Sequence, residues 1–145
     1  MRIESATLDT SHVTKELGMS PTQTRFVGER RSRNSVWDKA LWEFDVESEK
    51  ADVAPENWPD WPQWDSLEKA FEKLLQIFSS HAALIQSYRQ HHDVYLWVGH
   101  FYSSFAGGPR LSAKILKALG DFGVQVWIDT HSIDRDGDPN PETGA

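Results

Sequence analysis

The sequence predicts an α+β domain: a single mixed β-sheet of about five strands, with helices mainly on one of its faces. Two observations support this. Apolar side chains alternate with acids over residues 36–47 and run almost without a break over residues 94–102, as strands do. Over residues 66–91 and 112–119, apolar side chains recur every three or four positions, as helices do. The expected element order is β-α-β-β-α-α-β-α-β.

The first third of the chain supplies the opening strands. We expect strands over residues 3–8 and 23–28, joined by a helix over 12–17 that Thr10 or Ser11 caps and Gly18 ends. Residues 30–34 are polar and indicate a hairpin loop. In the strand over 36–47, the period of two separates a buried face from a solvated one. The buried face carries Trp42, Phe44 and Val46, and the solvated face carries Glu43, Asp45 and Glu47.

The second half of the chain predicts a helical region followed by two strands of the sheet that a crossover helix joins. Asp65 and Glu68 resemble a capping box at the start of the helical region 66–91, which Ser79 and Ser80 interrupt. Residues 94–102 form a central strand, buried on both sides, and Ser112 caps a helix over 112–119. Residues 124–130 then return in the same sheet. We expect one domain over residues 1–133 and a flexible acidic tail over 134–145.

Composition narrows the classes of function. The 145 residues include no cysteine, which excludes disulfides and thiolate metal sites and fits a cytoplasmic protein. We find no secretory signal in the first residues and no apolar run long enough to span a membrane. The net charge is −7, and residues 43–72 hold ten acids against two lysines, which is −8. We therefore expect no nucleic acid as partner and favour a basic protein surface.

Several segments carry a family resemblance over residues 6–129. They are L-G-M-S-P-T-Q-T-R-F-V-G-E, D-V-Y-L-W-V-G, G-G-P-R-L-S and L-G-D-F-G-V-Q-V-W-I-D. Together they resemble the domain-of-unknown-function family 4279. The resemblance implies no catalytic residues, because the family defines none, and some of its members look like immunity proteins of toxin systems. The acidic, tryptophan-rich link over residues 49–64 departs from the family pattern.

No catalytic residues or metal ligands are predicted. The histidines lack the spacing of metal ligands on a helix, and strand alternation places His100 out of phase with Asp129 and His131. Residues 134–138 do not satisfy a calcium loop. The glycines at 107–108 are explained by a tight strand-to-helix turn, and the chain has neither a cysteine nor a G-x-S-x-G nucleophile. We predict no metal and no cofactor.

The tryptophans are the most distinctive feature. Trp58, Trp61 and Trp64 lie close together in a segment that two prolines stiffen. One interpretation is a lid over the sheet face that presents Tyr95, Trp97 and Trp127. The other is an anchor for a partner protein. We expect Trp64 to pack in the core, and Trp58 or Trp61 to be more exposed.

These observations favour a non-catalytic protein-binding domain, most concretely an immunity-type protein that neutralises a basic toxin. The predicted binding residues combine aromatic anchors with steering acids. They are Trp58, Trp61, Tyr95, Trp97, Trp127, Glu43, Glu47 and Asp52. Two alternatives stay open: a small-molecule binder or enzyme that uses the aromatic sheet face, with His100, His131 and Asp129 nearby, and a homo-oligomer that uses this face as its self-interface.

Overall fold

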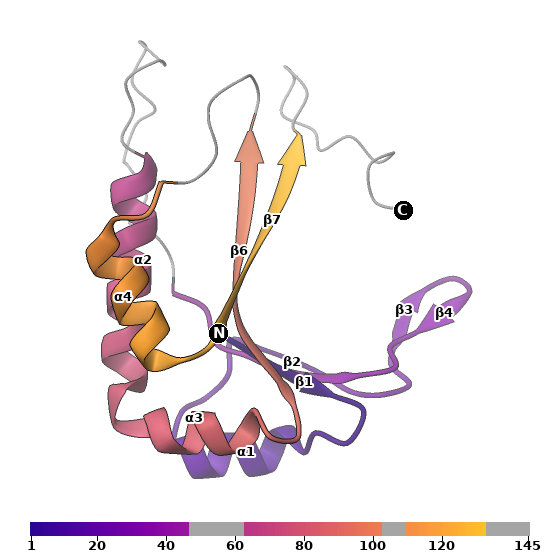
Figure 1. Cartoon of the computed structure of the whole chain (residues 1–145). Helices are drawn as coiled ribbons and strands as arrows, with labels where there is room; N and C mark the ends of the chain where they lie inside the picture. Colours follow the sequence, from indigo (N-terminus) through magenta and orange to yellow (C-terminus); the bar gives the residue numbers. More distant parts are fainter. Residues whose placement is uncertain (47–62, 103–109, 133–145) are drawn as a thin grey trace.

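The computed structural model describes residues 1–46, 63–102 and 110–132. Its main sheet has five strands, in the order β2 (Gln23–Arg25), β5 (Ala40–Glu43), β1 (Arg2–Ser5), β6 (Asp93–Tyr102) and β7 (Gln125–Ser132). Neighbouring strands are antiparallel except β6 and β7, which run parallel (Figure 1). The predicted single mixed sheet in an α+β domain is confirmed. The strand expected to be central, β6, is second from one edge of this sheet.

The parallel pair β6–β7 is joined through α4 (Ala113–Phe122), as the sequence predicts. Ser112 caps this helix, its Oγ accepting the Ile115 N–H at 3.3 Å. Gly123 ends it in the left-handed conformation with φ 76°, which glycine adopts without strain. The chain then turns directly into β7.

The remaining helices begin and end close to the predicted positions. Helix α1 (Thr10–Leu17) starts at a cap formed by Asp9, rather than by Thr10 or Ser11, and stops at Gly18. Helix α2 (Gln63–Phe78) is separated from α3 (Ala82–Tyr88) by the 3-10 turn η2 (Ser79–His81), so the predicted interruption is confirmed. Within the described chain, no helix is both long and apolar enough to cross a membrane.

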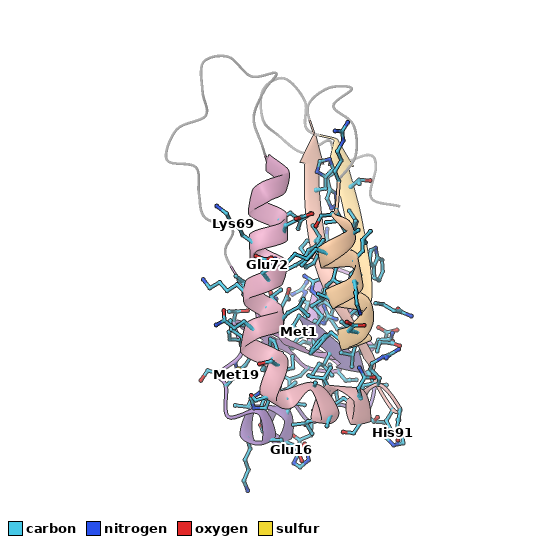
Figure 2. The ribbon with its side chains drawn as sticks, turned by 60° about the vertical axis from the view of Figure 1, so that its left-hand side comes forward. Met1, Glu16, Met19, Lys69, Glu72 and His91 are labelled. Atoms are coloured by element: carbon cyan, nitrogen blue, oxygen red, sulfur yellow. The ribbon has the colours of Figure 1, made fainter. Side chains whose placement is uncertain are left out.

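The predicted capping box at Asp65 and Glu68 is wrong. Helix α2 already begins at Gln63, so Asp65 lies inside its first turn. The Glu68 carboxylate instead accepts the backbone N–H of Ser112 and, at 3.0 Å, its Oγ–H. Lys114 Nζ lies 2.7 Å from Glu72 Oε1 on the same pair of helices. These contacts hold the start of α4 against α2, and the two helices lie side by side (Figure 2).

All four α-helices contribute to one core on one face of the sheet, the inner face. This face carries Ile3, Trp42, Val94 and Leu96, each 4% exposed or less. Phe78 at the end of α2 packs edge-on against Trp42, with ring centroids 6.5 Å apart. Burying aromatic rings of this size removes a large apolar area from water and drives the helices onto the sheet. The prediction that helices gather mainly on one face is confirmed.

The segment expected to be one strand over 36–47 divides in two. Residues 37–39 separate β4 (Ser35–Val36) from β5, and β4 pairs with β3 (Arg30–Ser32) in a small sheet of its own. The region predicted as a polar hairpin loop, residues 30–34, therefore contains β3 and the turn that leads into β4. The strands expected over 3–8 and 23–28 are also shorter than predicted.

Candidate binding face

The face of the sheet turned away from the core, the outer face, collects polar and aromatic side chains. It carries Arg2, Glu43, Tyr95, Trp97 and Trp127, because alternate residues of a strand point to opposite faces. The register aligns them in neighbouring rows. Arg2 is paired with Glu43 on one side and with Tyr95 on the other, and Trp97 is paired with Trp127. The predicted aromatic residues Tyr95, Trp97 and Trp127 thus lie together on adjacent strands.

Arg2 links the acidic and aromatic parts of this face. Its Nε donates to Glu43 Oε1 at 2.7 Å, and its guanidinium carbon lies 4.0 Å from the centroid of the Trp97 ring. A guanidinium stacked on an indole gains from the negative potential of the ring face. Both contacts fix the Arg2 side chain across three neighbouring strands.

Glu43 corrects a sequence-based prediction. We expected it on a solvated face, but only 3% of the residue is exposed. Burial raises the pKa of its carboxyl, and the Arg2 guanidinium opposes this shift. Its Oε2 atom is buried and has no hydrogen-bond partner among the described residues. A buried acid of this kind cannot steer a partner from a distance, so Glu43 does not belong with the exposed steering acids.

Tyr95 and Trp127 form the aromatic end of the outer face. Their ring centroids lie 5.5 Å apart. Tyr95 is 7% exposed, and burial, with the nearby Glu4 carboxylate, raises the pKa of its hydroxyl. Trp127 is 56% exposed. The pair therefore presents one large, open indole that rests on a buried tyrosine.

A chain of ion pairs continues the outer face toward the opposite edge of the sheet. Arg25 Nη2 lies 3.1 Å from Glu4 Oε2, and both side chains are 15% exposed. Lys39 Nζ lies 2.7 Å from Asp93 Oδ2 and 3.8 Å from Glu4 Oε1. The pKa of Lys39 is raised, mainly by its hydrogen bond to Asp93. These charges neutralise one another. Among the described side chains of the five-stranded sheet, Trp127 is the large hydrophobic one that stays more than half exposed.

Comparison with known proteins gives a family. The model of a domain of unknown function, DUF4279, matches residues 1–132. The chain belongs to this family. No curated protein and no solved structure shows a significant match to it. The resemblance drawn from the sequence motifs is therefore confirmed.

The histidines of this DUF4279 domain do not converge with a carboxylate cluster. His100 is paired with Thr130 on the inner-face side of β6 and β7, whereas Asp129 and His131 alternate with them. His131 Nε2 lies 3.1 Å from Asp129 Oδ2. Across the residues that the structure describes, no group of three or more histidines and acids could hold a metal ion.

Several predicted residues lie outside the described part of the DUF4279 domain. They are Trp58, Trp61, Glu47, Asp52, the tail over 134–145 and the side chain of Trp64. In contrast, sequence reasoning missed Arg2, Glu4 and Arg25. The alternation around Ile3 could have placed Arg2 and Glu4 on the outer face. Nothing local in the sequence indicates that Glu43 and Arg2 are partners, because 41 positions separate them.

Proposed function

We propose that this domain is a non-catalytic protein-binding domain and that the outer face of its sheet is where the partner docks. The observation that carries the proposal is Trp127, which is 56% exposed although it lies within a β-strand next to Tyr95. Tryptophan is enriched at the energetic centres of protein interfaces, because it buries a large apolar area with little loss of side-chain freedom. An exposed Trp127 that packs on the buried Tyr95 ring is therefore suited to anchor a partner protein.

The charge of the chain supports a basic partner. The net charge is −7: residues 43–72 carry −8 and the rest of the chain carries +1. Opposite charges around an apolar anchor accelerate docking and discriminate against wrong partners. An immunity-type protein that neutralises a basic toxin is the most concrete form of this proposal. That form rests on the resemblance of some family members to immunity proteins.

The test is affinity capture from a lysate of the source organism at low and at high salt, with identification by mass spectrometry. We expect the wild type to capture a basic protein that is retained at low salt and released at high salt. We expect the Trp127→Ala variant not to capture this protein. If Trp127→Ala captures the same protein equally well, the outer face is not the docking surface. If the only captured protein is a second copy of this chain, the outer face is a self-interface instead.

A second candidate is a small-molecule binder that uses the same face. The observation that favours it is Glu43, a buried acid with a raised carboxyl pKa beside Arg2, Tyr95 and Trp97. Perturbed acids near aromatic rings are common at ligand sites. Thermal-shift screening with a metabolite extract separates the candidates. A shift that Glu43→Gln removes, together with no captured protein, would favour the small-molecule function.

A further inference from the structure

The second surface of interest is a hairpin arm, defined as residues 26–38 and built around β3 and β4. Figure 1 shows it extending from the sheet on the side away from the helices. Five large hydrophobic residues are more than half exposed in the described chain, and three of these belong to the arm. They are Phe26, Val27 and Val36, at 52%, 52% and 61%. Exposed apolar groups concentrated in one short segment are typical of a contact surface.

The arm is also basic. Residues 26–38 contain three arginines, Arg30, Arg31 and Arg33, and two acids, Glu29 and Asp38, so the arm carries +1 in a chain of net charge −7. No ion pair joins these three arginines to another described residue. Arg30 Nε donates to the carbonyl oxygen of Ser32 at 3.2 Å, which still leaves most of its donors open. Arginine guanidinium groups bind carboxylates through paired hydrogen bonds.

The arm is held in shape by contacts that a flexible loop would lack. Gly28 N–H donates to the Trp37 carbonyl at 2.8 Å, and Trp37 N–H donates to the Glu29 carbonyl at 2.8 Å. Two guanidinium groups contact the Trp37 ring, that of Arg25 at 3.8 Å and that of Arg31 at 4.6 Å from the ring centroid. Because Arg25 also pairs with Glu4, this stack ties the arm to the sheet. A surface that is already ordered loses less entropy on binding.

We infer that the arm is a second interaction surface, which binds an acidic segment of a partner protein that also carries apolar side chains. The three arginines would pair with its carboxylates, and Phe26, Val27 and Val36 would cover its apolar groups. This goes beyond the proposed function, which uses the outer face and a basic partner. The exposed aliphatic side chains of Val27 and Val36 beside the arginines favour a protein segment, which offers apolar side chains next to its carboxylates, over a nucleic acid, whose outer surface is phosphate and sugar.

The test selects short random peptides displayed on phage against three forms of the full chain. These are the wild type, Arg30→Glu/Arg33→Glu, which keeps the contact between Arg31 and Trp37, and the matched control Lys15→Glu/Lys73→Glu, which makes the same change in net charge at exposed helix positions. We expect the wild type to enrich peptides rich in Asp and Glu with at least one aliphatic or aromatic residue. A selected peptide should bind the arm variant at least about tenfold more weakly and the control almost unchanged.

A fourth form, Phe26→Ser, separates the apolar contribution, and we expect several-fold weaker peptide binding from it. Thermal melts check that each form is folded. The inference is overturned if the wild type enriches no acidic peptide or if the arm variant and the control lose binding equally. It is also overturned if an oligo-dT probe, rather than acidic peptides, binds the arm. If sedimentation shows that the wild type self-associates and the arm variant does not, the arm binds a second copy of this chain and the inference is overturned.

Discussion

Arg2 and Glu43 form an ion pair between directly facing residues of β1 and β5, with Nε and Oε1 2.7 Å apart. The Glu43 side chain is 4% exposed and that of Arg2 is 23% exposed. The charge of Glu43 is therefore removed from water, and Arg2 is the described cation paired with it. This arrangement makes the two residues energetically dependent on each other.

That dependence can be measured with a double-mutant cycle. Arg2→Met leaves a buried carboxyl without its cation and should lower the free energy of unfolding by about 2 kcal/mol, less than for a fully buried pair because Arg2 is partly exposed. The double variant Arg2→Met/Glu43→Gln should lose less than the sum of the two single variants. Urea unfolding gives the free energies of unfolding of the wild type, the two single variants and the double variant. Additive losses would show that the pair is not coupled.

Two glycines at the end of α4 provide a matched comparison. Gly123 has φ 76°, and a Cβ there would lie 2.9 Å from Gln86 Nε2, so Gly123→Ala should destabilise the domain by about 1–2 kcal/mol. A Cβ on Gly120 meets nothing within 4 Å, and this residue lies in a helix. Gly120→Ala should therefore stabilise by about 0.5–1 kcal/mol. Opposite shifts in thermal melts are the expected result, and equal shifts would contradict the assigned end of α4.

Stability should rise as the pH increases from 6 to 8. Burial lowers the pKa of the Met1 α-amino group from 8.0 to about 6, and burial with the neighbouring His91 also lowers the pKa of His92. In this range the unfolded chain binds more protons than the folded one, so the free energy of unfolding increases with pH. The shift of the α-amino pKa contributes up to about 3 kcal/mol to the free energy of unfolding. This additional free energy of unfolding should be fully present above pH 8 and lost below pH 6.

Urea unfolding at several pH values checks this prediction. His92→Asn should reduce the slope mainly below pH 6.5, because the pKa of His92 is lowered from that value on folding, while the contribution of the α-amino group persists. This substitution also replaces the ring whose Nδ1 contacts Ser5 Oγ at 2.7 Å, so its effect is read from the slope and not from the absolute stability. A free energy of unfolding that falls with pH over this range would contradict the assigned shifts.

The acidic segment allows a test of charge steering that avoids the buried Glu43. Glu47→Lys/Asp52→Lys should slow association with a basic partner and change the dissociation rate less. Exposed charges act mainly before contact, and salt screens them over about 8 Å at physiological ionic strength. Stopped-flow association at several salt concentrations measures the effect. An association rate that responds neither to salt nor to these substitutions would mean that the acids do not steer the partner.

The sequence predicts elements well where the periodic pattern is long. The apolar run from Val94 to Tyr102, the cap at Ser112 and the strand over residues 124–130 were enough to predict that β6 and β7 lie in one sheet and are joined through a helix. The same reasoning divided the helical region at Ser79. In each case the decisive interactions are local: hydrophobic period, caps and a left-handed glycine.

Prediction from the sequence fails where a side chain interacts with a residue that is distant in the chain. Alternation correctly separated Trp42 from Glu43, but the face with Glu43 is covered rather than wet, because Arg2 packs across it from β1. Similarly, Glu68 looked like a capping residue, but it binds Ser112 in another helix. A sequence pattern assigns a side chain to partners a few positions away, whereas the folded chain also brings residues from other elements into hydrogen-bond distance.

Trp127 is the residue on which the proposed function depends most directly, and Leu116 on α4 is its natural control. The two are 56% and 53% exposed and lie on different elements. Each alanine variant should unfold within about 1 kcal/mol of the wild type, because neither side chain is fully buried. Affinity of the captured partner is the deciding measurement. The account predicts that Trp127→Ala weakens binding by about 2 kcal/mol or more while Leu116→Ala does not, and unchanged binding by folded Trp127→Ala would contradict it.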